Sequence, residues 1–177
     1  MGLQTDLIPW EAADVVGLAF TDDDSQAVVA TYPTQEDTAN RFYVPFDDTD
    51  EEGILFGGIM PQGYDLNQDL KLEIEGWMAS ATSGKIDLQA AVEAITEGDE
   101  IFMPSEASFD TTNSADETVP ATATWPMTIT ITLTNKDSVA AGDMIRIRLH
   151  RDADDGTNDT ATGDFNLNKM RLFQEAS

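Results

Sequence analysis

The sequence predicts an all-β fold: an antiparallel β-sandwich, jelly-roll-like, with about eight to ten strands in a single domain over residues 1–177. Apolar and polar residues alternate with a period of two through much of the chain, which is the pattern of half-buried strands. Turn residues, mainly Asp, Gly and Pro, separate these segments. No strand–helix–strand alternation is present, which argues against a parallel α/β sheet.

The clearest predicted strand covers residues 127–134, where Met, Ile and Leu alternate with Thr and β-branched residues occupy both faces. Residues 86–92 alternate as well, but 88–95 also fit helical spacing, so both structures remain open there. The other strands that the alternation predicts are 15–20, 27–32, 41–46, 54–59, 66–80, 144–150 and 165–173.

Two segments are expected to lie outside this strand pattern. Residues 1–14 are a candidate attachment arm. Residues 104–124 are rich in Ser, Thr, Asp and Pro, which predicts a long loop. Loops of this length in compact domains often carry function or contact neighbouring molecules.

The charge balance is strongly acidic, with 9 Lys and Arg against 34 Asp and Glu and a formal net charge of -25. Nucleic acids and anionic lipid surfaces are bound mainly by basic side chains, so we expect neither as a partner. Lys is scarce and Asp carries most of the excess, which resembles proteins of halophilic microbes and their viruses; an ordinary solvated surface explains the same charge. The absence of cysteine excludes disulfides, thiolate metal sites and cysteine nucleophiles.

No set of residues has the spacing of a catalytic site, and we therefore expect no enzyme activity. The single histidine, His150, ends a predicted strand beside Arg151 and has no nucleophile motif to accompany it. Glu73 and Glu75 near Trp77 could form a glycosidase pair of carboxylates, but a solvated strand face is the favoured explanation, because among so many acids some pair always has the required separation. Trp10, Trp77 and Trp125 are candidates for stacking on sugar rings or for filling a core or rim.

A turn rich in oxygen ligands is a candidate site for Ca²⁺, although nothing in the sequence requires a cofactor. It is not an EF-hand loop, because Gly156 comes one residue early and Gly163 stands where the bidentate Glu belongs. An acidic turn between strands explains the same residues. The candidate ligands are Asp152, Asp154, Asp155, Asn158 and Asp159.

The C-terminal half carries a succession of short motifs. An Ala-Gly-Asp sequence at 141–143 precedes a strand that ends in Arg151-Asp152, and an Asp-rich turn then leads to Gly163-Asp164 and a final strand. This order resembles the last strands of jelly-roll domains in virion proteins of tailed viruses, of the head-decoration, turret or head-fibre type.

The resemblance implies a structural virion protein on the capsid exterior, without catalysis, that forms a homotrimer and binds the major capsid protein or another virion protein. Together with the acidic composition it implies a virus of a halophilic host. Trimer interfaces bury apolar residues that a lone sandwich would expose. The candidate interface residues are Phe56, Met60, Phe102, Met103 and Phe109.

The alternative function is a carbohydrate- or host-receptor-binding jelly-roll module, and a glycosidase is a third possibility. An exposed aromatic surface around Trp77 or Trp125 would favour carbohydrate binding, because sugar rings stack on flat aromatic rings. Burial of all three tryptophans, with an apolar face near residues 102–109, would favour assembly.

Overall fold

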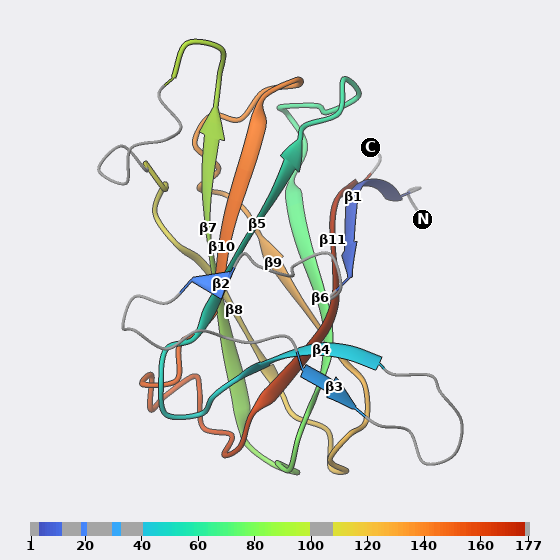
Figure 1. The fold of residues 1–177 in the computed structure, drawn as a ribbon, viewed down its shortest axis with the longest axis vertical. Helices are drawn as coiled ribbons and strands as arrows, with labels where there is room; N and C mark the ends of the chain where they lie inside the picture. Colours follow the sequence, from blue (N-terminus) through green and yellow to red (C-terminus); the bar gives the residue numbers. More distant parts are fainter. Residues whose placement is uncertain (1–3, 12–18, 21–29, 33–40, 100–107, 176–177) are drawn as a thin grey trace.

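The computed structural model describes residues 4–11, 19–20, 30–32, 41–99 and 108–175, and these form a sandwich of two antiparallel sheets (Figure 1). The predicted all-β jelly-roll fold is confirmed. Within the described residues there is no helix, and hence none that is long and apolar enough to cross a membrane. The strands are β1 (Gln4–Glu11), β2 (Ala19–Phe20), β3 (Ala30–Tyr32), β4 (Arg41–Phe46), β5 (Gly53–Ile59), β6 (Leu70–Met78), β7 (Lys85–Ile95), β8 (Asn113–Thr118), β9 (Met127–Thr132), β10 (Met144–Arg151) and β11 (Phe165–Glu175).

The first sheet, named here the β6 sheet, has the order β3-β4-β11-β6-β9. One edge of β11 is shared by two strands: β4 pairs with its first residues, and β1 pairs with residues 169–175. The second sheet, the β10 sheet, has the order β2-β5-β10-β7-β8. Every strand pair is antiparallel. Apart from β3–β4 and β7–β8, neighbouring strands in each sheet are not consecutive in the sequence, as expected of a jelly roll.

The core lies between the sheets and is built by the alternation seen in the sequence. In β9, Met127, Ile129 and Ile131 are buried while the threonines between them are exposed. Gly76 occupies an inward position of β6 where a Cβ atom would overlap the Phe165 ring and the Asn166 carbonyl oxygen. Glycine is therefore required there by the close approach of β11.

Residues 85–95 form a strand, so the helical alternative for 88–95 is wrong. β7 pairs with β10 on one side and with β8 on the other, which uses its backbone groups on both edges. Its outward residues Asp87, Ala91 and Glu93 are buried along with its inward ones. Burial of both faces explains why the apolar pattern of this segment was ambiguous.

Two expectations about segments outside the strands need correction. The predicted loop over 104–124 contains β8, which pairs with β7; the sequence NSADET lacks the alternation that reveals a strand. Residues 104–107 lie outside the described residues. In the candidate attachment arm, 1–14, residues 4–11 form β1 and belong to the β6 sheet. An attachment role for this segment stays a prediction.

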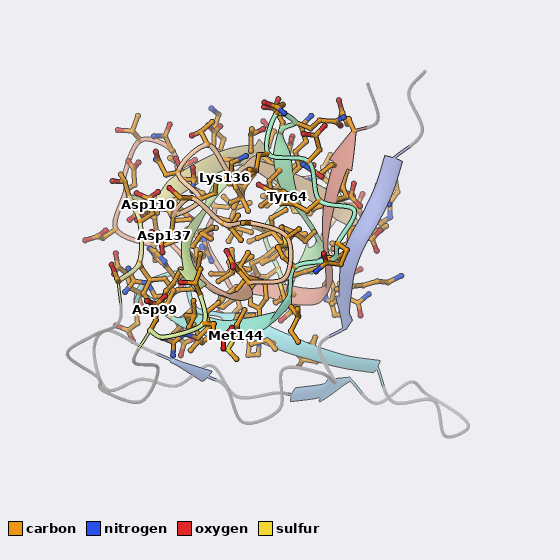
Figure 2. The ribbon with its side chains drawn as sticks, turned by 90° about the horizontal axis from the view of Figure 1, so that it is seen from above. Tyr64, Asp99, Asp110, Lys136, Asp137 and Met144 are labelled. Carbon is orange, nitrogen blue, oxygen red and sulfur yellow. The ribbon has the colours of Figure 1, made fainter. Side chains whose placement is uncertain are left out.

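The loops at one end of the sandwich are tied together by polar contacts (Figure 2). The Lys136 ammonium lies 5.6 Å from the centre of the Tyr64 ring. The Asp137 backbone N–H donates to the Asp110 carboxylate at 2.9 Å. The first contact connects the β9–β10 loop to the β5–β6 loop, and the second connects the β9–β10 loop to the segment before β8.

A buried ion pair joins the end of β10 to the start of β11. The Arg151 side chain is 0% exposed, and its Nε and Nη2 atoms donate to the two Asp159 carboxylate oxygens at 2.8 and 2.7 Å. Nη2 also donates to the Ala161 carbonyl at 2.7 Å, and Nη1 donates to the Gly163 carbonyl at 2.9 Å. Arg151 thus organises the whole turn that leads into β11.

Removal of Asp159 should strongly destabilise the protein, because it leaves the Arg151 guanidinium buried without a countercharge. We expect Asp159→Ala to lower the free energy of unfolding by about 3–5 kcal/mol, measured by urea denaturation. Asp116→Ala is the matched control, since Asp116 pairs with Lys85 at the surface and should contribute less than about 1 kcal/mol. Equal losses in the two variants would contradict the role given to the buried pair.

Candidate functional site

An aromatic pair lies on the outer face of the β6 sheet. Trp77 and Tyr43 occupy outward positions of β6 and β4, because the residues that alternate with them, including Val44 and Met78, are buried in the core. Their ring centres are 5.5 Å apart and the ring planes are inclined at 57°. Asn166 of β11 pairs in register with Trp77 on one side and with Pro45 on the other. We name Tyr43, Trp77 and Asn166 the aromatic face.

A third aromatic side chain is exposed at the same end of β6. Trp125 is 60% exposed, and the preceding Thr124 donates its backbone N–H to the Met78 carbonyl at 3.0 Å. This hydrogen bond holds the loop before β9 against the strand end that carries Trp77. Trp77 is half-buried, and the side chain of Trp10 lies outside the described residues. The exposure of Trp125 shows that the three tryptophans are not all buried.

The charged residues next to the aromatic face form ion pairs across β6 and β11. The Arg171 guanidinium donates to both oxygens of Glu73, at 2.6 and 2.9 Å. The Lys169 ammonium lies 3.5 Å from the Glu75 carboxylate. Each member of the candidate carboxylate pair thus has a cationic partner, the arrangement expected of a solvated strand face.

The candidate interface residues are only partly at the surface. Phe56 and Met60 are 2% and 1% exposed and belong to the core, so their assignment to an interface is wrong. Phe56 shares the inward face of β5 with Ile54, and Met60 follows that strand. Phe109 is half-buried and lies beneath the Arg148 guanidinium. Phe102 and Met103 lie outside the described residues.

The structure places the predicted calcium ligands in different environments. Asp159 is held by Arg151, and Asp155 accepts hydrogen bonds from the Thr157 backbone and from the Asn158 side chain, both at 2.9 Å. Two groups of carboxylates instead meet at Asp152, each with oxygen atoms within 4.8 Å of one another. They are Glu51, Asp152 and Asp154, and Asp87, Asp152 and Asp155.

Glu51 and Asp87 were missed in the sequence because they lie far from the acidic turn along the chain and only the fold brings them to it. The gathering of Asp152, Asp154 and Asp155 with these two residues follows the oxygen-rich chemistry that Ca²⁺ prefers. Asp159 does not fit this group, since its two oxygens are bound to Arg151. Binding of Ca²⁺ at the turn stays a prediction.

The crowding of like charges perturbs the carboxyl groups in this region. Burial, a hydrogen bond with Asp154 and the charges of Asp154 and Asp87 raise the pKa of Asp152 to about 6. Burial is also the main cause that raises the pKa of Asp87. Near the start of β11, burial and then the charges of Asp47 and Asp48 raise the pKa of Asp164. The folded protein therefore gathers acidic groups in positions that disfavour their ionised forms.

No protein-family model matches the chain, and no curated protein matches it. Among solved structures, an arabinose-bound α-L-arabinofuranosidase aligns with a TM-score of 0.53 and 14% identity, over 95% of this chain and 25% of the enzyme. A xylan-binding domain from Paenibacillus barcinonensis aligns with a TM-score of 0.49 and 11% identity, over 100% and 99% of the two chains. A family 11 carbohydrate-binding module from Clostridium thermocellum aligns with a TM-score of 0.47 and 14% identity, over 100% and 98%. At these identities the likeness concerns the β-sandwich fold alone.

The raised pKa of Asp152 predicts that the protein becomes more stable as the pH falls from about 7.5 to about 5. In this window the folded state binds a proton that the unfolded state, with a carboxyl pKa near 3.8, does not bind, so protonation favours folding. The carboxylate is partly solvated, and we expect a gain of about 1 kcal/mol, or about 2–4 °C in Tm. Thermal denaturation across this pH range measures it. Asp152→Asn should flatten the profile, and an equally steep profile in that variant would contradict the assignment.

The same crowding predicts a dependence on salt. Charge repulsion is screened over roughly 3 Å in 1 M salt, so folding should strengthen as NaCl is raised from about 0.1 to about 3 M. We expect Tm to rise by at least about 5 °C, or roughly 2 kcal/mol for a domain of this size. An unchanged Tm over this range would contradict adaptation to high salt.

Proposed function

We propose that the protein is a carbohydrate-binding jelly-roll module whose ligand lies across the aromatic face and Trp125. The contact between Trp77 and Tyr43 on an outward sheet face carries the proposal. The β-sandwich fold supplies the sheet on which these residues are placed, and it does not by itself specify the ligand.

The chemistry of the aromatic face suits a saccharide. The C–H bonds on one face of a pyranose ring pack against an aromatic ring, while its hydroxyl groups need hydrogen-bonding partners at the ring edge. Asn166 lies in register beside Trp77, and Glu75 is the next outward residue of β6. Thr128, exposed on β9, pairs in register with Glu75. The carboxylate of Glu75 and the hydroxyl of Thr128 thus border the rings at the surface, while the Asn166 amide is only 5% exposed beside Trp77.

The virion interpretation stays a prediction. The core positions of Phe56 and Met60 remove two of its five interface residues. A homotrimer, binding to the major capsid protein and a place on the capsid exterior each require their own test. A host-receptor-binding role on a virion would be compatible with the saccharide site proposed here.

Substitution of the aromatic residues should weaken binding to neutral polysaccharides. We expect Trp77→Ala and Trp125→Ala each to lower affinity for a binding glycan by at least about tenfold, equivalent to about 1.4 kcal/mol. Affinity electrophoresis with xylan, arabinoxylan, laminarin and mixed-linkage glucan would find the ligand, and calorimetry with its oligosaccharides would measure the loss. Leu66→Ala is the matched control. Leu66 is a large apolar residue that is 56% exposed, close to the 60% of Trp125, but it lies before the start of β6, at the end of the strand opposite to Trp77.

Two results would overturn the proposal. One is the absence of binding to every glycan at both low and molar salt. The other is an equal loss of affinity in Leu66→Ala and the tryptophan variants. Melting temperatures of the three variants should be compared, so that a folding defect in Trp77→Ala is not taken for lost binding.

A further inference from the structure

The outer face of the β10 sheet carries a row of basic side chains. Ile145, Ile147 and Leu149 are 0% exposed and point into the core, so the residues between them, Arg146 and Arg148, point outward, and His150 continues the row. The chain has only 9 Lys and Arg, against 34 acids. Two arginines on the outward face of one strand are therefore a local exception to the acidic charge of the protein.

Arg148 differs from the other arginines whose side chains the structure describes. Arg146, Arg151 and Arg171 each bind a carboxylate, at 2.5, 2.7 and 2.6 Å. Arg148 has no carboxylate partner among the described residues, and its buried Nε atom has no hydrogen-bond partner there. Its guanidinium carbon lies 5.5 Å from the centre of the Phe109 ring. The ring holds the guanidinium in place without neutralising it.

An apolar hollow adjoins this row at the end of the sheet where β10 begins. It has a volume of about 310 Å³, and its walls include Leu55, Ile59, Met144 and Arg146. Ile59 and Met144, paired in register, are 68% and 42% exposed, and Figure 2 views Met144 from this end of the sandwich.

Gly57 lines the hollow and has no side chain. A Cβ atom there would overlap the Ile145 carbonyl oxygen, so the position cannot carry a side chain without a shift of the backbone. Across from Arg148 in register stand Leu55 on β5 and the small Ala91 on β7. The arginine is thus bordered by short or apolar residues.

We propose that this face binds an anionic saccharide, with Arg148 contacting its charged group and the hollow accommodating the sugar ring. The planar fork of a guanidinium matches a carboxylate in two parallel hydrogen bonds, which points to a uronate. The inference rests on the proposed function for the class of ligand, a saccharide, and adds its charge and the face that recognises it. A sulfated saccharide presents the same charge in another geometry.

The net charge of -25 does not prevent this binding in salt. At molar salt, repulsion between distant charges is screened beyond about 3 Å, while hydrogen-bonded contacts at Arg148 persist. Glu93 is bound to Arg146, and Asp116 of β8 is bound to Lys85. Asp87 and Asp152 lie toward the far end, near His150. No carboxylate stands between Arg148 and the hollow among the described residues.

Calorimetry in 1 M NaCl with the full chain tests the proposal. The ligands are oligogalacturonate, its methyl ester and a sulfated galactan oligosaccharide. We expect oligogalacturonate to bind at least about tenfold more tightly than the ester. Arg148→Gln should lose most of this preference, and Arg148→Lys should recover part of it. Lys169→Gln is the matched control, since it makes the same change in net charge on the β6 sheet, where Lys169 is 52% exposed.

The outcomes separate this inference from the proposed function. Preference for the uronate that is lost in Arg148→Gln and kept in Lys169→Gln and Trp77→Ala supports the site. Equal losses in Arg148→Gln and Lys169→Gln would show non-specific attraction and overturn it, as would failure of oligogalacturonate to bind. Tighter binding of the sulfated oligosaccharide through Arg148 would overturn the assignment of a carboxylate. Neutral glycans that bind through Trp77 would leave the proposed function standing in each case.

Discussion

The buried pair of Arg151 and Asp159 is the interaction on which the turn between β10 and β11 depends. Arg151 ends β10 in one sheet, while the carbonyls that it binds at Ala161 and Gly163 lead directly into β11 of the other. Asp159 also accepts the backbone N–H of Asp87 from β7 at 3.1 Å. A single guanidinium therefore sets the path of the turn that joins the two sheets, and this path places the acidic residues of the turn beside Glu51 and Asp87.

The cost of this arrangement is visible in the protonation of the carboxyl groups. Asp152 follows Arg151 in the chain, and Asp164 follows Gly163, whose carbonyl Arg151 binds. Burial together with neighbouring charges raises the pKa of both carboxyl groups. The positive charge of Arg151 lowers the pKa of Asp164, but it does not offset burial and the charges of Asp47 and Asp48, so the pKa stays raised. A protein with so few cations cannot compensate every group that its fold brings together, so protons and salt become part of its stability.

The sequence predicted the strands whose two faces differ, and it failed where both faces are alike. β6 and β9 were evident because buried residues alternate with Glu or Thr. β8 has no large apolar residue, and its pairing with β7 rests on backbone bonds and on Asn113, whose amide donates to the Ala90 and Asn135 carbonyls. No local pattern encodes such a strand. Phe56 was misassigned to an interface although it shares the parity of Ile54, so alternation alone could have placed it in the core.

The candidate sites were also predictable only in part, because alternation shows which residues share a strand face but not which strands are neighbours. Trp77 was a candidate from the sequence, either for stacking on sugar rings or for filling a core or rim, but its partner Tyr43 became significant only when β4 was placed beside β11. Likewise, alternation predicts the row of basic side chains on β10, while the residues that pair with Arg148 in register, Leu55 and Ala91, are known only from the placement of β5 and β7.

A sandwich separates its core from two solvent-facing sheet surfaces, and each surface can change without altering the packing between the sheets. Here the two surfaces carry different chemistry: aromatic rings bordered by polar groups on the β6 sheet, and on the β10 sheet an apolar hollow beside an arginine that has no carboxylate partner among the described residues. Both rely on the same inward residues of the core to direct them outward. This dependence explains how one core can position two chemically different surfaces, because alternation alone places side chains along a strand at a spacing of about 7 Å.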